Sequence, residues 1–427
     1  MIQDLEQLLT LAQRAGAETA EVYYSRSLSH PVFFEANRLK QLESSESEGT
    51  ALRLWRNGCP GLAVAYGPVD PQTLVEKAIA LSALNPPETP EINRGQIHRF
   101  PALGQAVPVE DLITLGKTAI AELREHYPDV LCSSELECEE DTTILMNTEG
   151  LQCEYRELST SYYFGVEWVR GEDFLAVYDG EYGRTLPPVN GVLQQILQRL
   201  AWARDNASTP TGKLPMIFTP NAATLLWGTL ISALNGQRIL EKSSPWSDKG
   251  GQVVLPDCFT FYQDPTFSPH DCPFDDEGTL TQFLPLMSQG RIENFYSDRT
   301  TARKLGLSST GNGFRPGLGG YPVPSLVNWI VEPGQADLTE LIAQVESGLL
   351  IDQCLGGGPD ISGDFDLNID LGYRIEKGKI VGRVKDTMIA GNVYQVLQQT
   401  LALGNDRQWN GSCYTPSLLI EGISAIS

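Results

Sequence analysis

Apolar residues at helical spacing open the chain and recur at intervals along it. Leu5, Leu8, Leu9 and Ala12 fall on one face of a helix that Gly16 would end, because glycine readily adopts the left-handed conformation at a helix C-terminus. The same spacing recurs in five later segments. Helices are therefore predicted over residues 71–81, 109–126, 192–203, 221–234 and 393–403.

Runs of β-branched and aromatic residues separate these helices. Residues 51–56 and 62–66 are of this kind, and they flank Asn57-Gly58. Asn-Gly supplies the positive φ angles of a type I′ turn, so these two runs are predicted to form a hairpin. Further along, a strand-rich meander is predicted up to about residue 182, with turns at residues 147–150 and 170–173.

Two Pro-rich stretches without apolar periodicity, residues 85–108 and 205–212, divide the chain. They delimit three predicted units over residues 1–86, 108–205 and 212–427. The first unit is α/β, the second is a strand-rich meander with flanking helices, and the third is larger, Gly-rich and of mixed β character. Because strands and helices do not alternate regularly, the predicted fold class is α+β.

The net charge of −23 narrows the choice of partners. Phosphate backbones and anionic lipids repel a polyanion, so neither nucleic acid nor a membrane surface is expected to bind. Solubility alone explains such a charge. A basic partner subunit or a basic peptide substrate is the alternative.

Targeting and redox signals point to the cytoplasm. No stretch approaches the roughly 20 apolar residues that span a bilayer, and the N-terminus lacks the basic start and apolar run of a secretory signal. The eight cysteines are scattered and form no CxxC pair. Reduced thiols in a cytoplasmic protein are therefore expected.

The histidines exclude one kind of catalytic site. A helix-borne zinc peptidase site needs two histidines within about a turn of each other, with a glutamate between them. The chain has four histidines, and the closest two, His98 and His126, lie far apart in the sequence. The chain therefore cannot build a histidine-paired zinc site from one helix.

The densest polar cluster spans residues 270–277. Asp275, Asp276 and Glu277 could bind a hard cation, and His270 and Cys272 could add softer ligands. A solvated acidic loop is the alternative.

A Gly-rich segment over residues 306–313 offers a second possibility. It is not a GxSxG motif and lacks the lysine of a phosphate-binding loop. Its backbone N–H groups could still hold a substrate carbonyl or carboxylate, but a plain turn is the favoured interpretation.

Several motifs of the third unit resemble the TldD/PmbA family, also called the modulator of DNA gyrase family. They are Phe-Asp-Asp-Glu-Gly at 274–278, Ser-Asp-Arg-Thr-Thr-Ala-Arg-Lys-Leu-Gly at 297–306, Ser-Thr-Gly-Asn-Gly at 309–313 and Ile-Ala-Gly-Asn at 389–392. Residues 15–22 and 39–49 are similar to that family's opening. The resemblance extends over nearly the whole chain, in order.

This resemblance implies a role in a cytosolic metallopeptidase that acts on unfolded or modified peptides. TldD-like subunits of the family carry an HExxxH helix that holds zinc together with a cysteine, whereas PmbA-like subunits, also called TldE, lack it and pair with them. The corresponding helix here is residues 221–234, and the ligand positions would fall within residues 225–232, which contain no His, Glu, Asp or Cys. Cys413 does not stand in the TldD-type context. The chain is thus identified as PmbA-like.

A PmbA-like chain is expected to have no catalytic residue, metal ligand or bound cofactor of its own. Zinc is expected in an HExxxH-bearing TldD-like partner, and the chain would complete the substrate chamber as a pseudoenzyme subunit of a hetero-oligomer. An extended peptide could add as a strand to an exposed sheet edge. The candidate cleft residues are Asp276, Glu277, Thr310, Gly311 and Asn312, for which a structural role is the alternative.

Two other functions stay open at this stage. One is a non-proteolytic, chaperone-like adaptor that binds unfolded peptides without a partner. The other is an independent enzyme that uses the 270–277 cluster with a metal.

Overall fold

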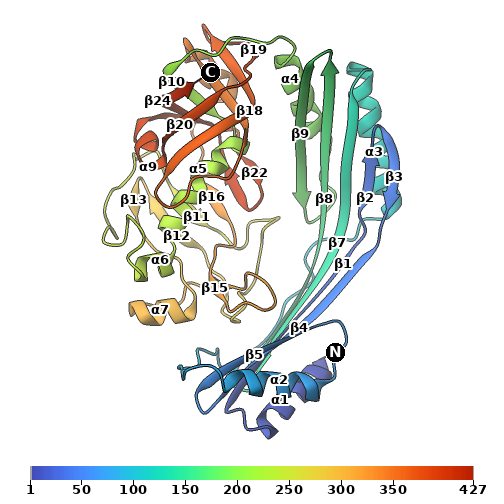
Figure 1. Ribbon diagram of the computed structural model, residues 1–427, viewed down its shortest axis with the longest axis vertical. Helices are drawn as coiled ribbons and strands as arrows, with labels where there is room; N and C mark the ends of the chain where they lie inside the picture. The colour runs from blue at the N-terminus through green and yellow to red at the C-terminus, as the bar shows by residue number, and fades with distance from the viewer. Residues whose placement is uncertain (1, 427) are drawn as a thin grey trace.

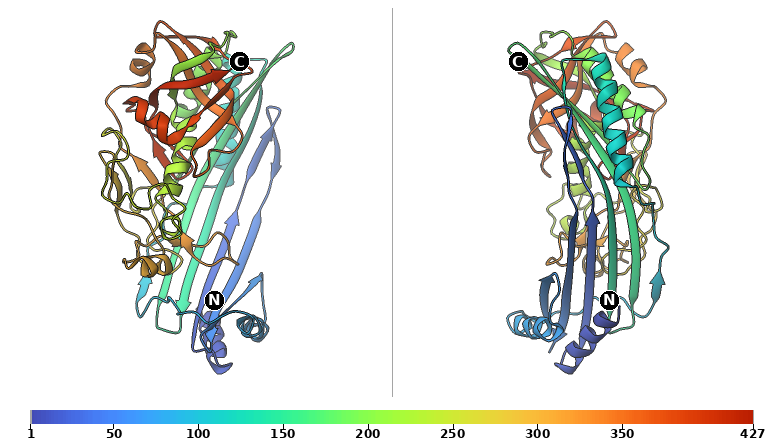
Figure 2. Two further views of the ribbon diagram at one scale, coloured as in Figure 1. Left: turned by 60° about the vertical axis from the view of Figure 1, so that its left-hand side comes forward. Right: turned by 90° about the vertical axis from the view of Figure 1, so that its right-hand side faces the viewer.

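The computed structural model describes residues 2–426 and has the mixed α+β architecture that the sequence predicts. A long curved sheet forms one side of the molecule, and a C-terminal body built on two smaller sheets lies against its upper half (Figure 1). Two helices lie at the lower end of the long sheet, near the N-terminus (Figure 2).

Nine strands make up the long sheet. In chain order they are β1 (Thr19–Ser29), β2 (Val32–Glu35), β3 (Arg38–Leu42), β4 (Ser45–Arg56), β5 (Cys59–Tyr66), β6 (Ile97–Arg99), β7 (Leu131–Asn147), β8 (Gln152–Arg170) and β9 (Asp173–Gly183). Strand β7 pairs along one edge first with β2 and then with β1, and along its other edge with β8. Strand β3 pairs with β2, β4 with β1 and β5 with β4, while β6 and β9 pair with different parts of β8. The predicted units over residues 1–86 and 108–205 thus contribute to one sheet.

The β7–β8 pair is the longest strand pair of this sheet. It runs without interruption from Leu131 opposite Glu167 to Met146 opposite Gln152. The turns before and after β8 contain Gly150 at φ +89° and Gly171 at φ +66°, which confirms the turns predicted there. These strands have 17 and 19 residues, far more than the usual length of about 5–6. One hydrophobic cluster packs against the upper end of β7 and a different one packs against its lower end.

The predicted hairpin and helices of the first 205 residues are also confirmed. Asn57 and Gly58 have φ angles of 52° and 71° between β4 and β5. The helices are α1 (Ile2–Arg14), α2 (Pro71–Ser82), α3 (Val109–His126) and α4 (Asn190–Trp202). Of the helices within residues 2–426, none combines the length and the apolar character needed to cross a bilayer.

The C-terminal body contains two main sheets. The first has β10 (Gly212–Phe218), β17 (Ser347–Leu355), β18 (Asp364–Glu376), β19 (Lys379–Arg383), β20 (Met388–Asn392), β21 (Thr400–Leu403) and β24 (Leu418–Ile426). It closes into a ring, because β10 pairs with both β17 and β24. The second has β11 (Phe261–Gln263), β12 (Leu284–Ser288), β13 (Arg291–Ile292), β16 (Trp329–Val331), β22 (Gln408–Asn410) and β23 (Cys413–Thr415).

Short elements complete the body. They are α5 (Pro220–Ala233), α6 (Gly236–Leu240), α7 (Arg299–Leu305), α8 (Leu338–Ala343), α9 (Val393–Val396), the 3₁₀ helix η1 (Leu397–Gln399) and the pair β14 (Gly313–Phe314) and β15 (Val323–Pro324). The helix predicted over residues 393–403 is wrong beyond its first turns. Residues from Thr400 onward form β21 instead, because they pair with β24 in the ring.

Helix α5, which matches the prediction over residues 221–234, is anchored in the C-terminal core. Thr219 caps it, and Pro220 occupies its first turn, where a missing N–H costs nothing. Trp227 is fully buried, packs edge-on against Phe261, and donates its indole N–H to Thr415 Oγ1 at 2.8 Å.

A buried charge cluster joins the C-terminal body to the lower half of the long sheet. Glu21 on β1 is 1% exposed, and its Oε1 lies 2.9 Å from both Arg53 Nη2 on β4 and Arg315 Nη2 in the C-terminal body. Arg315 also lies over the ring of Tyr23, at 5.0 Å from its centroid. The one carboxylate thus neutralises two buried guanidinium groups that would otherwise repel each other.

Replacing Glu21 tests how much its carboxylate contributes to the stability of the protein. We expect Glu21→Gln to lower the free energy of unfolding by about 3 kcal/mol, because the change removes the one carboxylate that bridges the two buried guanidinium groups. The matched control is Glu46→Gln, which breaks the exposed pair with Arg26 and should cost less than about 1 kcal/mol. Urea denaturation of both variants measures the two losses, and equal losses would contradict this role for Glu21.

Candidate functional site

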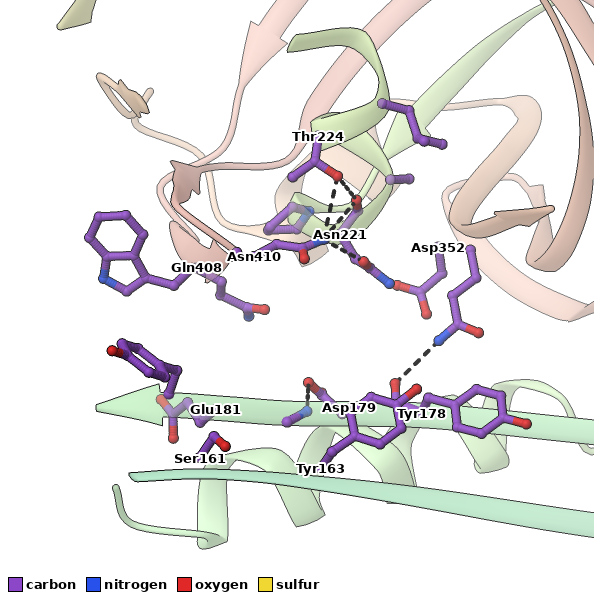
Figure 3. Close-up of a pocket in the computed structure, with 18 of the residues that line it drawn as sticks. Ser161, Tyr163, Tyr178, Asp179, Glu181, Asn221, Thr224, Asp352, Gln408 and Asn410 are labelled. Atoms are coloured by element: carbon purple, nitrogen blue, oxygen red, sulfur yellow. Dashed lines mark hydrogen bonds between the residues drawn. The ribbon is translucent and has the colours of Figure 1, made fainter. Parts of the chain in front are cut away.

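A cavity of about 750 Å³ lies between the upper part of the long sheet and the C-terminal body. Strands β8 and β9 form one wall, and the start of α5 with parts of β17 and β22 forms the other. Figure 3 shows Ser161, Tyr163, Tyr178, Asp179 and Glu181 on the sheet wall, and Asn221, Thr224, Asp352, Gln408 and Asn410 on the opposite wall.

Arg199 of α4 ties the two walls together. Its Nη1 lies 2.6 Å from Asp179 Oδ2 on β9, and its Nε lies 2.9 Å from Asp352 Oδ2 on β17. Thr219, the cap of α5, donates its hydroxyl to Asp352 Oδ1 at 2.9 Å. A further tie is the 3.2 Å hydrogen bond from Gln353 Nε2 to the carbonyl of Tyr178.

Each charge of this bridge favours the ionised form of its partners. Burial raises the pKa of Asp179, and the guanidinium of Arg199 opposes that rise. For Arg199 burial favours the neutral form, but Asp352 and Asp179 outweigh it and raise its pKa above the ordinary value. The bridge is therefore held by a guanidinium that stays charged between two carboxylates.

The first turn of α5 presents amide and hydroxyl groups to the cavity. Asn410 Nδ2 donates to Asn221 Oδ1 at 2.6 Å and lies 3.4 Å from Thr224 Oγ1 (Figure 3). Leu225 follows and also lines the cavity. This part of the wall can donate and accept hydrogen bonds but carries no charge.

The rest of α5 does not fit a zinc ion. Zinc takes thiolate, imidazole or carboxylate ligands, and residues 225–232 offer aliphatic, indole and hydroxyl groups. Leu226, Trp227 and Leu230 are moreover fully buried in the core. Within residues 2–426, no group of three or more His, Cys, Asp and Glu side chains could hold a metal ion.

Aromatic rings border another part of the cavity. Tyr182 of β9 stacks on His270 with ring centroids 5.2 Å apart, and His270 lies 4.6 Å from Trp409. Burial lowers the pKa of His270 to about 4, and the positive charge of Arg184 acts in the same direction. The imidazole is therefore neutral at pH 7 and contributes to an aromatic wall.

Strand β9 borders the cavity as a sheet edge. Its only pairing partner among residues 2–426 is β8. The alternation of the ladder directs the backbone groups of Phe174, Tyr178, Gly180 and Tyr182 away from β8. The carbonyls of Phe174 and Tyr178 accept bonds from the side chains of Arg383 and Gln353. The outward groups of Tyr182 have no such backbone or side-chain bond within the described chain.

The five residues predicted to line a cleft come together elsewhere. Two loops of the C-terminal body bring Asp276, Glu277, Thr310, Gly311 and Asn312 into one hydrogen-bonded network. The Arg315 N–H donates to Asp276 Oδ2 at 2.7 Å, the Arg299 N–H donates to Glu277 Oε2 at 2.8 Å, and Thr310 Oγ1 donates to Asn312 Oδ1 at 2.7 Å. Of these five, Asp276 lines a second cavity of about 350 Å³, and none lines the larger one.

Asp275 shows what the acidic cluster does in this fold. Its carboxylate accepts backbone N–H groups from Glu277, Thr279 and Gly313, at 3.0, 2.8 and 2.9 Å. Cys272 donates its thiol to the carbonyl of Phe274 at 3.2 Å. The cluster thus uses its oxygen and sulfur atoms to hold two loops together, while His270 faces the larger cavity.

The comparisons with known proteins identify the family. A family model described as the PmbA/TldA metallopeptidase C-terminal domain matches residues 211–427, and the model for domain 1 of the same metallopeptidases matches residues 20–82. The chain belongs to the PmbA/TldD family. The family inferred from the sequence motifs is therefore confirmed.

Relatives within the PmbA/TldD family carry both subunit names. The "Metalloprotease PmbA homolog" of Haemophilus influenzae is 29% identical over 62% of this chain and 57% of its own length. The "Metalloprotease TldD homolog" of the same organism is 30% identical over 55% of this chain and 48% of its own length. The matched region thus spans about half the length of these two relatives.

A solved structure confirms the fold across the whole chain. The crystal structure of TldE from Thermococcus kodakarensis superposes with a TM-score of 0.88 and 22% sequence identity. The match covers 99% of this chain and 100% of that one.

Arg199, Asp179 and Asp352, which tie the two walls of the cavity together, were not among the residues predicted from the sequence. One signal could have identified Arg199. It lies on the apolar face of its helix, beside Ile196 and Leu200, where a charged residue needs a buried partner. Its partners lie on other elements, so the sequence does not reveal which carboxylates they are.

The lowered pKa of His270 predicts a dependence of stability on pH. The unfolded histidine gains its proton near pH 6.5, but the folded one gains it only near pH 4, so stability from this residue is present above pH 6.5 and is lost as the pH falls through this window. Between pH 7.5 and 5 we expect a loss of about 1 kcal/mol, allowing for the partial exposure of the ring. His270→Phe keeps the aromatic contacts and should remove this loss. Urea denaturation at the two pH values measures it, and an equal loss in both proteins would contradict the assignment.

Proposed function

We propose that this chain is the TldE-like, non-catalytic subunit of a cytoplasmic zinc peptidase complex and that it presents an extended peptide to a TldD-like partner. The single observation that carries the proposal is the chemistry of α5. Where the resemblance places the zinc ligands of the catalytic subunit, this helix has no group that binds zinc. Hydrolysis is then supplied by the partner, which also holds the metal.

The edge of β9 supports the peptide-presenting role. A peptide that adds as a strand to a sheet edge binds mainly through backbone hydrogen bonds, so many sequences are accepted. The outward N–H and carbonyl of Tyr182 and the outward carbonyl of Gly180 lie where β9 lines the cavity, whereas the Gly180 N–H donates to Asp179 Oδ1 at 2.8 Å. The amides of Asn221 and Asn410 on the opposite wall can bond the other side of such a peptide.

The cysteines support a cytoplasmic setting. All eight are free, and the thiols of Cys132, Cys153 and Cys413 are buried. Because oxidising compartments favour paired cysteines, this arrangement is typical of a protein from a reducing one.

Co-purification tests the subunit assignment. We expect the tagged chain, expressed at its native level in its source organism, to recover an HExxxH-bearing chain. After the subunits are separated, metal analysis should find zinc with that partner and not with this chain. Recovery of homomers alone, or stoichiometric zinc together with chelator-sensitive peptidase activity in the solitary chain, would contradict the proposal.

The same purified proteins distinguish the role of a peptidase subunit from that of an independent peptide-binding adaptor. If the solitary chain binds an unstructured peptide, adding the partner should convert binding into cleavage. Tight binding that no partner converts into cleavage would favour the adaptor.

A matched pair of variants tests the role of the β9 edge. Tyr182→Pro and Tyr182→Leu both remove the aromatic ring, but only proline also removes the outward N–H, a change that edge strands tolerate. We expect the proline variant to bind a short unstructured peptide about three- to tenfold more weakly than the leucine variant, since one backbone hydrogen bond is lost. Fluorescence anisotropy with a labelled peptide measures both affinities. Equal affinities would show that the peptide does not pair with this edge.

A further inference from the structure

Two tyrosines and two glycines face each other across the β8–β9 pair at the larger cavity. Tyr163 of β8 lies opposite Gly180 of β9, and two positions along the pair Gly165 lies opposite Tyr178. Residues that lie opposite each other, or two positions apart on one strand, share a face of the sheet. Both tyrosines therefore project from the same face, and each has a glycine as its partner on the other strand.

The glycines leave room for the two rings. A Cβ atom at Gly165 would lie 2.8 Å from Tyr178 Cε1, and one at Gly180 would lie 3.1 Å from Tyr163 Cδ2. Both separations are shorter than the roughly 3.5–4.0 Å of an ordinary contact between carbon atoms. Each ring thus occupies space that a side chain on the partner strand would otherwise take.

The two rings form one aromatic surface on the sheet wall. Their planes are 9° apart and their centroids are 5.8 Å apart, and Figure 3 shows the two residues next to each other on this wall. Both line the larger cavity, and Tyr163 is 49% exposed. Part of this aromatic surface is therefore open to a ligand.

The opposite wall adds apolar groups to the same cavity. The hydrogen bond from Gln353 Nε2 to the carbonyl of Tyr178 brings β17 beside the rings. Cys354, the next residue of β17, and Leu225 of α5 line the cavity as well. Both walls therefore offer apolar contacts to a side chain that enters between them.

The edge of β9 can place a peptide beside the rings. Gln353 occupies the outward carbonyl of Tyr178, so pairing with a peptide can begin at the outward carbonyl of Gly180 and continue at Tyr182. In paired strands, side chains that lie opposite each other share a face, with Cβ atoms about 4.5–5.5 Å apart. A peptide residue opposite Gly180 therefore projects its side chain onto the face that carries the rings.

The absence of a side chain at Gly180 leaves this position open on that face. Tyr178 and Tyr182 flank it along β9, because they lie two positions before and after it. Across the pair, the ring of Tyr163 is the neighbouring group. A peptide side chain opposite Gly180 thus meets aromatic rings rather than a side chain of its direct partner.

We infer that the cavity binds an aromatic side chain of the peptide against the rings of Tyr163 and Tyr178, at the peptide position opposite Gly180. Aromatic rings attract one another in offset-stacked or edge-to-face arrangements, beyond the effect of the apolar area that they bury. The inference rests on the proposed function, because it assumes that the peptide pairs with β9. It adds the substrate class that backbone pairing leaves open.

Three peptides that differ at one position test the inference on the full chain. They share an unstructured sequence of Gly, Ser and Thr and carry phenylalanine, cyclohexylalanine or alanine at the centre. Cyclohexylalanine keeps the apolar character and approximate size of phenylalanine but has no aromatic ring. We expect phenylalanine to increase the affinity about tenfold or more over alanine and about two- to fivefold over cyclohexylalanine, as measured by isothermal titration calorimetry.

Two variants of one residue locate this preference on the rings. Tyr163→Leu removes the ring but keeps an apolar side chain, whereas Tyr163→Phe removes only the hydroxyl. The leucine variant should reduce the preference for phenylalanine over cyclohexylalanine to about onefold, and the phenylalanine variant should retain it. The control is Tyr66→Leu, which removes a ring that is 78% exposed and lies outside the cavity, and which should leave the preference as it is.

The outcomes separate the inference from the function on which it rests. Equal binding of the phenylalanine and cyclohexylalanine peptides would overturn the aromatic selection but keep the peptide-presenting role. A preference for phenylalanine that survives in Tyr163→Leu would overturn its assignment to these rings. Failure of all three peptides to bind would overturn both the inference and the proposed function.

Discussion

The arrangement of the cavity depends on one buried guanidinium. Arg199 reaches from α4 to Asp179 on the long sheet and to Asp352 on the C-terminal ring, and Asp352 in turn binds the cap of α5. Removing Arg199 would leave two unpaired carboxylates in a site with little access to water, which costs far more than an exposed pair contributes. The three charges therefore fix the separation of the two walls. Through them, Arg199 sets where the edge of β9 lies relative to the first turn of α5.

The long sheet contacts the C-terminal body through Glu21 and through Arg199, and the two contacts position different groups. Near the lower half of the sheet, Glu21 holds the loop that carries Arg315, and the candidate cleft residues predicted from the sequence belong to that network. Near the upper half, Arg199 frames a cavity that none of those candidates lines. The motifs that reveal the family thus include residues that hold the fold together, whereas the surface that can meet a ligand is formed by less distinctive residues such as Asn221, Gly180 and Asn410.

Local signals allowed much of the fold to be predicted, and long-range pairing limited the rest. The bounds of α3 and the turn at Asn57-Gly58 follow from residues close together in the sequence, so periodicity and turn chemistry predict them well. Residues 400–403 were predicted as helix because their apolar spacing suits either structure, and only the pairing with β24 decides for a strand. The cavity was not predictable for the same reason. Thr219 and Asp352 lie 133 positions apart, and no local sequence pattern around either residue predicts that the two are in contact.

Helix α5 contains no His, Cys, Asp or Glu, and this composition decides what the helix can do. A helix that holds a catalytic metal must turn polar side chains toward the substrate, and burying those side chains in a core would cost their hydration. Here Leu226, Trp227 and Leu230 fill the core instead, and Trp227 fixes the helix to β23 through Thr415. Only the start of the helix, up to Leu225 and including Asn221 and Thr224, reaches the cavity. The helix therefore serves as a rigid support for neutral hydrogen-bonding groups, which suits a subunit that holds a peptide in place while another chain performs the hydrolysis.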